Sequence, residues 1–381
     1  MSFDTLNKKE FLEQYWQKKP LVIRGGFAHL KDILEPDELA GLSCENGVES
    51  RIVIEEGGAK PWEVKHGPFS EDVYKSLPKD KWTLLVQGVE QWLPEVYEIL
   101  DSFKFVPNWR VDDVMVSYAP DGGSVGAHTD QYDVFLIQGW GKREWRVGRS
   151  PLDEEDLIPG LELKILNGFE DFDSHTLELG DVLYLPPQYA HHGIAIGDSM
   201  TYSVGFRAPH NKELLGHFCD HLLIHGEQEY HYKDPNLGIQ ESSGEIKQEA
   251  LEKLYKMVMS TVQNKESFTR FIGEYMTIPK YDVKPEPYVG KPWDDFSDEL
   301  ILEKFLGLRT VYQLEAGTIQ FFANGKSTSL TMTAMELVKV ICDGGIEFSW
   351  SELKSYCKDS ESREFLTLLI GQGLLLPRDE A

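Results

Sequence analysis

The sequence predicts an α+β protein in which a strand-rich core is followed by helices and then by a small winged-helix-like unit. Three observations carry this prediction. Between residues 110 and 208, short runs of β-branched and aromatic residues alternate with Gly-containing turns, which is typical of a barrel or sandwich. After Pro209 the apolar residues change to helical spacing. A stiff linker then precedes the last segment, and its prolines are Pro279, Pro285, Pro287 and Pro292.

The elements expected in the first half of the chain are mostly short strands. A helix is expected around residues 11–16, where Lys18-Lys19-Pro20 ends it, and a strand follows at residues 21–23. The core is expected to contain six strands, at residues 114–118, 134–137, 144–147, 176–179, 182–185 and 201–206. The turns that separate them are expected at residues 121–123, 139–141, 180–181 and 197–198.

The second half is expected to begin with helices. Apolar residues at helical spacing predict one helix over residues 214–223 and another over residues 246–258. Ser242 and Glu245 resemble a capping box that opens the second of these helices. From about Asp294 we expect a helix, a hairpin over residues 312–329 with an Asn324-Gly325 turn, and helices around residues 335–341 and 365–369.

Composition narrows the classes of function. The 381 residues carry a net charge of −26, which argues against direct binding of nucleic acid and favours a basic partner. The C-terminal segment 294–381 is itself acidic, with 8 Lys or Arg against 15 Asp or Glu, so it is not interpreted as DNA-binding. Residues 151–181 hold ten acidic residues, either as a solvated loop or as a field that steers a cationic partner.

The sequence predicts a cytoplasmic protein. Its first ten residues lack the apolar run of a signal peptide, and no apolar stretch approaches the ~20 residues that span a bilayer. The four cysteines are widely separated and have no Cys-x-x-Cys spacing, so neither a disulfide framework nor a thiolate zinc site is predicted.

The candidate metal ligands are His128, Asp130 and His191. In an extended chain, residues two apart point to the same face, so His128 and Asp130 can converge on one ion. Two imidazoles and one carboxylate are the donor set that holds non-haem Fe(II) with positions left open. Adjacent strand residues face opposite ways, so only one of His191 and His192 can join the cluster, and the residue pattern favours His191.

Arg143 is the candidate for binding an anion. Strand alternation places it on the same face as Trp145 and Val147, which is apolar and expected to be buried. A buried guanidinium needs an anionic partner, either a dicarboxylate ligand near the metal or an internal Asp or Glu. A second histidine set, His217, His221 and His225, recurs at helical spacing, and packing or a subunit contact is favoured over a zinc site.

These residues resemble the JmjC family of Fe(II)- and 2-oxoglutarate-dependent oxygenases. The resemblance rests on His128-x-Asp130, Arg143 and Pro186-Pro187-x-x-x-His191. A closer likeness is to the bacterial ribosomal oxygenases of the YcfD type, which hydroxylate an arginine side chain, and it spans almost the whole chain. The supporting stretches are residues 11–20, 109–113, 128–135 and 202–209.

The resemblance implies a double-stranded β-helix (cupin or jelly-roll) core. The domains it implies are a JmjC catalytic domain at 1–209, a helical dimerisation region at 210–278, the Pro-rich linker at 279–293 and a winged-helix-like domain at 294–381. It further implies that the protein is a homodimer. Many relatives carry Lys where this chain has Arg143, a change that keeps the positive charge.

The resemblance also implies the cofactors and the substrate. Fe(II) would be held by His128, Asp130 and His191, and 2-oxoglutarate, used together with O2, by Arg143 with help from Ser117. The substrate would be an arginine of the sixteenth large-subunit ribosomal protein. Asp121 and Ser203 would contact it, although Asp121 could equally form a turn and Ser203 fill a strand.

Other functions stay open at this stage. One is a histidine hydroxylase of the same superfamily. A second is a cupin-like metal protein that does not use 2-oxoglutarate. A demethylase and a non-catalytic scaffold are less favoured.

Overall fold

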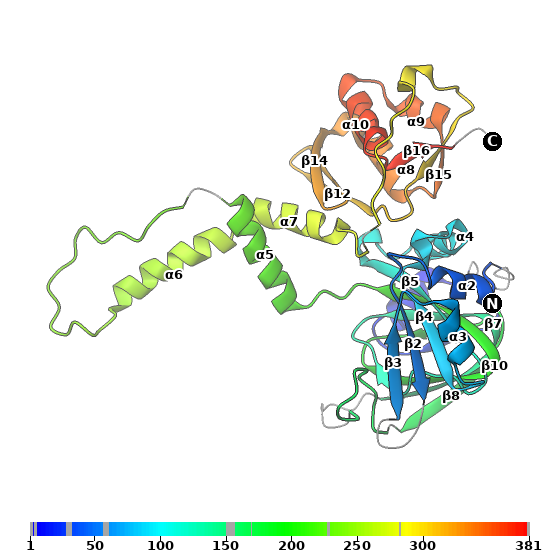
Figure 1. Ribbon diagram of the computed structural model, residues 1–381. Helices are drawn as coiled ribbons and strands as arrows, with labels where there is room; N and C mark the ends of the chain where they lie inside the picture. Colours follow the sequence, from blue (N-terminus) through cyan, green and yellow to red (C-terminus); the bar gives the residue numbers. More distant parts are fainter. Residues whose placement is uncertain are drawn as a thin grey trace.

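The computed structural model describes residue 3 and residues 6–27, 33–55, 61–149, 157–168, 170–226, 229–281 and 283–378. Part of the predicted acidic segment, residues 151–156 and 169, therefore lies outside the described residues. Figure 1 shows a strand-rich domain, a second domain formed by the C-terminal part of the chain, and helices that extend away from both. No helix in the described ranges is long and apolar enough to cross a membrane.

The strand-rich domain is organised around one ten-stranded antiparallel sheet. Its main path runs in the order β1-β9-β7-β10-β5-β4-β2-β3, while β6 pairs with β10 and β8 pairs with β7. The strands are β1 (Leu21–Ile23), β2 (Ser50–Glu55), β3 (Trp62–His66), β4 (Trp82–Val86), β5 (Val111–Ala119), β6 (His128–Thr129), β7 (Val134–Arg149), β8 (Asp171–Leu177), β9 (Val182–Leu185) and β10 (Tyr189–Phe206).

Two of these strands are longer than predicted. The sequence predicts turns at residues 139–141 and 197–198, but both segments lie inside the long strands β7 and β10, which pair along most of their length. The strands bend there instead of ending. Gly141 has a φ of +62°, and a Cβ on it would lie 1.9 Å from the backbone oxygen of Asp198. Because glycine has no Cβ, the backbone of β7 can approach the backbone of β10 closely here, and the strand continues.

The N-terminal third completes the sheet and covers one face of it. The sequence predicts α1 (Lys8–Gln14) and β1, but it gives little indication of β2, β3 and β4. The remaining short elements are α2 (Pro36–Leu42), α3 (Glu71–Ser76), η2 (Val89–Gln91), α4 (Pro94–Tyr97), η3 (Glu98–Phe103) and η4 (Asn108–Arg110). Phe11 of α1 packs in the largest core cluster with Phe103, Phe135 and Tyr184, so α1 and η3 are fixed on β7 and β9.

Three helices follow the sheet: α5 (Asn211–His225), α6 (Gln248–Val262) and α7 (Lys265–Thr277). The predicted capping box is wrong, because α6 begins after Lys247 and the segment with Ser242 and Glu245 forms turns instead. The predicted histidine set lies on α5 and faces α7. The rings of His217 and Tyr275 are tilted at 34° to each other with 5.0 Å between centroids, and His221 Nδ1 lies 3.7 Å from Glu274 Oε2.

The C-terminal domain combines two small sheets with three helices. One sheet has the order β15-β11-β16 and the other β12-β13-β14. The elements are η6 (Trp293–Asp295), β11 (Ile301–Lys304), β12 (Thr310–Glu315), β13 (Thr318–Ala323), β14 (Lys326–Thr331), η7 (Met332–Ala334), α8 (Met335–Asp343), β15 (Glu347–Ser349), α9 (Trp350–Tyr356), α10 (Ser360–Gly371) and β16 (Leu375–Pro377).

Two details of this domain differ from the prediction. The helix expected after Asp294 is absent from the described residues there, which form the short turn η6 and then strand β11. The expected hairpin is a three-stranded meander, because a second tight turn with positive φ at Ala316 and Gly317 joins β12 to β13. The Asn324-Gly325 turn joins β13 to β14 as predicted. Helix α7 packs against all three strands of the meander.

Candidate metal and co-substrate site

The three predicted metal ligands come together at one end of the sheet. His128 lies in β6 and is paired in register with His191 of β10, and Asp130 follows β6 directly. Each residue offers one ligand atom, and these atoms all lie within 4.8 Å of one another. The two imidazole rings are 4.2 Å apart between centroids, and His191 Nε2 lies 3.7 Å from Asp130 Oδ2. No other such group of His, Cys, Asp and Glu occurs in the described ranges.

Backbone hydrogen bonds orient both imidazoles. His128 Nδ1 lies 3.0 Å from the carbonyl oxygen of Gly126, and His191 Nδ1 lies 3.1 Å from that of Tyr189. A carbonyl accepts only from an N–H, so Nδ1 carries the proton and Nε2 is left as the donor atom for a metal. Burial, together with the nearby His128, lowers the pKa of His191 to about 4. Its ring is therefore neutral near pH 7, the form that binds metal.

Arg143 lies in β7, and its guanidinium is buried with only 4% of the residue exposed. Its Nε and Nη2 have no hydrogen-bond partner among the described residues. Burial lowers the pKa of Arg143 to about 10, which leaves it charged at neutral pH. No described carboxylate forms an ion pair with it. An internal salt bridge was the alternative, so the geometry favours an anionic ligand instead.

The indole of Trp145 adds a further unsatisfied donor beside Arg143. Its Nε1 is buried and has no hydrogen-bond partner in the described part of the chain. The guanidinium carbon of Arg143 lies 5.7 Å from the centre of the indole, which in turn lies 5.9 Å from the His191 ring. A Cβ on Gly193 of β10 would lie 2.6 Å from the indole, so only glycine lets the ring lie flat across that strand.

These side chains line one cavity of about 360 Å³. It extends from β7 and β10 across β5 to β4 and β2, so most of its wall is the sheet itself. The buried atoms of this lining that have no partner among the described residues are Nε and Nη2 of Arg143, Nε1 of Trp145, Nε of Arg51 and Oγ1 of Thr83. Four of these five atoms can only donate, which suits a ligand that brings acceptors. A dicarboxylate beside a His-Asp-His cluster fits this donor set, and the volume leaves room for a second molecule.

The match to known families agrees with this geometry. Residues 98–214 match the model described as a JmjC domain, and residues 260–376 match the ROXA-like winged helix. Ribosomal protein uL16 3-hydroxylase of Escherichia coli is 38% identical over 312 residues, which cover 81% of this chain and 82% of that protein. A probable ribosomal oxygenase of Haemophilus influenzae is 31% identical and covers 93% of this chain and 90% of its own.

The chain belongs to the JmjC-domain ribosomal oxygenases. A solved structure of YcfD, a ribosomal oxygenase from Escherichia coli in complex with cobalt and 2-oxoglutarate, superposes with a TM-score of 0.83 at 32% identity, covering 98% of this chain and 99% of that chain. The predicted family and fold class are therefore confirmed. The winged-helix match begins within α6, so it includes α7 and the linker as well as residues 294–376.

The remaining predicted site residues occupy different environments in this oxygenase. Ser117 of β5 and Ser203 of β10 are both buried and line the cavity. Ser117 Oγ lies 3.5 Å from the carbonyl oxygen of Thr201, a long contact that leaves the hydroxyl available to a ligand. Asp121 is exposed and does not line the cavity, and its Oδ1 accepts a hydrogen bond of 2.8 Å from the N–H of Gly197. That contact ties Asp121 to the backbone of β10.

Histidine 192 lies outside this cavity lining. It pairs in register with Arg146 rather than with His128, and the residues that form the lining include His191 alone of the two. Burial and the nearby Arg146 lower the pKa of His192 to about 4. The strand alternation that favours His191 as the ligand thus agrees with the geometry.

Two acidic residues of the cavity wall, Asp112 and Asp113 at the start of β5, were not predicted as site residues. Lys280 Nζ donates to Asp112 Oδ2 at 2.8 Å and to Asp113 Oδ2 at 3.2 Å. The hydroxyl of Tyr281 also donates to Asp113. Because Lys280 and Tyr281 lie more than 160 positions away in the chain, no local pattern could have linked them to these carboxylates.

Proposed function

We propose that this enzyme is an Fe(II)- and 2-oxoglutarate-dependent oxygenase that hydroxylates an arginine side chain of ribosomal protein uL16. The observation that carries the proposal is the buried, unpartnered guanidinium of Arg143 in the same cavity as the His-Asp-His cluster. The relative of known activity, a uL16 3-hydroxylase, supports the identity of the substrate.

His128, Asp130 and His191 would hold the iron, with the Nε2 atoms of the two imidazoles as donors. Arg143 would pair with the distal carboxylate of 2-oxoglutarate, and Ser117 would add a hydrogen bond from β5. When bound, iron, 2-oxoglutarate and O2 together supply the insertion of one oxygen atom into a C–H bond, while 2-oxoglutarate is converted into succinate and CO2. The protein contributes position and electrostatics.

Charge in the cavity favours arginine as the target residue. Three carboxylates, those of Asp112, Asp113 and Glu49, line this part of the cavity together with two cations, Arg51 and Lys280, so the acidic groups outnumber the basic ones. Ser203 lies on the neighbouring strand. A guanidinium pairs with carboxylates in planar, charge-assisted hydrogen bonds, and the surrounding acidic surface attracts a basic ribosomal protein. Neutral histidine would gain much less from these groups, so arginine is preferred over the histidine alternative. We assign Asp112 and Asp113 to substrate binding, in place of Asp121.

Coupled turnover of the co-substrate tests this function. Purified enzyme is incubated with Fe(II), 2-oxoglutarate and O2, and succinate is measured with and without uL16. We expect uL16 to increase succinate formation, and we expect His191→Ala to abolish it. Succinate formation that uL16 does not change would contradict the proposed substrate. A metal-loaded protein that neither binds nor consumes 2-oxoglutarate would favour a cupin-like metal protein instead.

We also propose that the protein is a homodimer formed through α5 and α6. Figure 1 shows α6 standing away from both domains, and none of its side chains is buried, although every residue of the helix is described. It nevertheless carries an apolar stripe, formed by Leu251, Leu254, Tyr255 and Val258, each at least 44% exposed. An isolated helix of this length is marginal in water, so a second copy covering the stripe accounts for its stability.

Light scattering tests the dimer. We expect a dimer mass for the wild type and a monomer mass for Leu254→Glu, which places a charge in the apolar stripe. The matched control is Lys256→Glu, which changes charge on the same helix outside the stripe and should leave the mass unchanged. A wild-type monomer at micromolar concentration would contradict the proposal. We also propose that the reaction takes place in the cytoplasm, which is supported by the ribosomal protein substrate of the relative.

A further inference from the structure

The first residues of β5, which carry Asp112 and Asp113, are held by the C-terminal domain. Arg309 precedes β12 and reaches across the seam between the two domains, so that its Nη1 donates to the carbonyl oxygen of Val111 at 3.3 Å. Its Nη2 donates to the carbonyl oxygen of Asp112. The same guanidinium lies 3.9 Å from the Asp112 carboxylate. Arg309 of the C-terminal domain therefore binds the backbone of this segment through two hydrogen bonds and also pairs with the carboxylate of Asp112.

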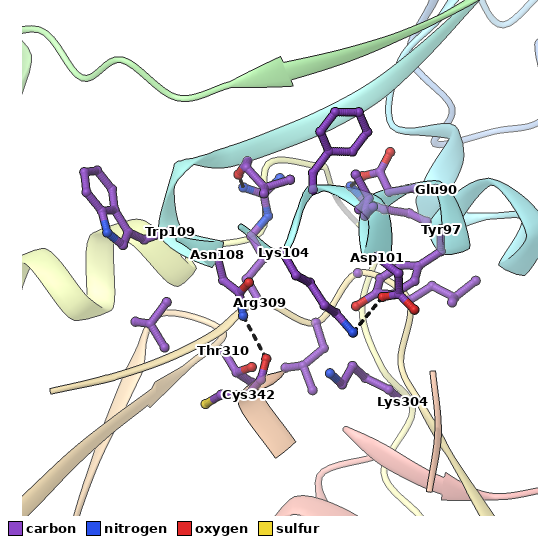
Figure 2. A pocket seen from close by; sticks show the side chains of 18 of the residues that line it. Glu90, Tyr97, Asp101, Lys104, Asn108, Trp109, Lys304, Arg309, Thr310 and Cys342 are labelled. Atoms are coloured by element: carbon purple, nitrogen blue, oxygen red, sulfur yellow. Dashed lines mark hydrogen bonds and ion pairs between the residues drawn. The ribbon is translucent and has the colours of Figure 1, made fainter. Parts of the chain in front are cut away.

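The adjacent peptide group of the same segment is held from within the catalytic domain. Glu90 of η2 is buried, and its Oε2 accepts a hydrogen bond of 2.9 Å from the N–H of Val114. Figure 2 shows Glu90 and Arg309 lining one seam cavity, which also includes Asn108. Arg309 and Glu90 thus hold β5 at consecutive peptide groups, and the side chains of Asp113 and Ser117 project from this strand into the active cavity.

The segment between α7 and the C-terminal domain also holds the two carboxylates of β5. Lys280 and Tyr281 follow α7 directly and bind the two carboxylates. Arg207 Nε also donates to Asp112 Oδ1 at 3.3 Å. Burial acts to raise the pKa of Asp112, but Lys280, Arg309 and Arg207 outweigh it and lower the pKa below its ordinary value. Asp112 is therefore a fixed anion whose position is set mainly by residues outside the catalytic sheet.

We propose that the C-terminal domain is a positioning element of the substrate site, in which Arg309 fixes the start of β5 so that Asp112 and Asp113 can bind the substrate cation. This inference rests on the proposed function, because it takes a cationic side chain as the ligand of the two carboxylates. It gives the acidic winged-helix domain a role that requires no nucleic acid, since its functional contact faces inward to the catalytic domain.

The test compares full-length Arg309→Met with two controls. Arg378→Met removes an arginine of the same domain that pairs with Glu303 and Glu347 and makes no contact with β5. Asn108→Ala removes a different seam contact, the 2.8 Å hydrogen bond from its side chain to the carbonyl oxygen of Cys342. Melting temperatures establish that each variant folds, and Arg309→Lys keeps the charge if the Met variant does not fold.

The measurements are kcat, the KM for 2-oxoglutarate and the KM for uL16. We add the dissociation constant of a short arginine peptide with the Zn(II)- and 2-oxoglutarate-loaded protein. We expect Arg309→Met to raise the KM for uL16 and the peptide dissociation constant about tenfold, the effect of losing hydrogen bonds from a charged group. The KM for 2-oxoglutarate and kcat should stay unchanged, Arg309→Lys should restore part of the loss, and both controls should behave as wild type.

Other outcomes would overturn the inference or would reject the proposed substrate. Wild-type affinity in Arg309→Met, or a wild type that does not bind the arginine peptide, overturns the inference. An equal effect in Asn108→Ala also overturns it, because general docking of the domains would then be responsible. If the wild type binds the peptide and Arg309→Met binds it weakly, but uL16 is not modified, the inference stands and the proposed substrate is rejected.

Discussion

Removing the charge of Arg143 separates co-substrate binding from metal binding. Burial lowers the pKa of Arg143 from 12.5 to about 10, which corresponds to roughly 3 kcal/mol of unfavourable free energy for holding the charge without a partner. A carboxylate ligand relieves this cost and adds charge-assisted hydrogen bonds. We therefore expect Arg143→Met to keep or raise the stability of the ligand-free protein and to weaken 2-oxoglutarate binding by about 3 kcal/mol, roughly 100-fold.

Ligand-induced stabilisation measures this effect without turnover. At a 2-oxoglutarate concentration of about 100 times the wild-type dissociation constant, the ligand adds about 2.7 kcal/mol to the stability of the wild type. The same concentration adds only about 0.4 kcal/mol to a variant that binds 100-fold more weakly. Melting temperatures and titration calorimetry of the Zn(II)-loaded proteins compare the two, with Arg143→Lys as the variant that retains charge. An equal shift in Arg143→Met, or a loss of zinc binding, would refute the role of Arg143.

Three other variants test neighbouring parts of the structure. Trp145→Phe removes the buried, unpartnered indole N–H together with one ring of the indole, so 2-oxoglutarate should bind about fivefold more weakly while zinc binds equally well. Unchanged affinity in calorimetry would mean that this N–H does not reach the ligand. Gly193→Ala places a methyl group against the indole and should also weaken 2-oxoglutarate, and a structure with Trp145 undisturbed would contradict this. Burial lowers the pKa of Lys304 to about 8, below its ordinary value of 10.5. Between pH 8 and pH 10.5 the unfolded state therefore binds more protons than the folded state. The contribution of Lys304 to the free energy of unfolding should rise with pH in this range. Denaturation of wild type and Lys304→Met from pH 7 to pH 10 should show the wild type gaining stability relative to the variant. Parallel curves would contradict a lowered pKa of Lys304 in the folded protein.

The metal ligands could be predicted from sequence because they depend on local geometry. His128 and Asp130 are two apart in an extended segment, and alternation along β10 selects His191 over its neighbour. The same alternation along β7 predicted that Arg143 faces inward. Strand boundaries were less predictable, since Gly141 marks a bend inside β7 where a turn was expected. Glycine permits both outcomes, and only the pairing with β10 distinguishes them.

The substrate-facing part of the site could not be predicted, because it is assembled from distant segments. In the sequence, Asp112 and Asp113 have no feature that distinguishes them from other acidic residues at the start of a strand. Their role depends on contacts with Lys280, Tyr281 and Arg309, which are distant in the chain. Asp121 was favoured because it lies beside a glycine turn near the metal motif, yet its carboxylate accepts a hydrogen bond from the backbone N–H of Gly197 in β10. Long-range contacts of this kind leave no periodic signal in the sequence.

If this oxygenase hydroxylates an arginine of uL16 as proposed, mass spectrometry of the modified protein will locate the added oxygen atom. The enzyme is incubated with uL16, Fe(II), 2-oxoglutarate and O2, and the peptides of uL16 are then sequenced by fragmentation. We predict the mass of one added oxygen atom on a single arginine, absent without 2-oxoglutarate and absent with His191→Ala. An oxygen atom located on histidine, or uL16 left unmodified while 2-oxoglutarate is consumed, would contradict the account.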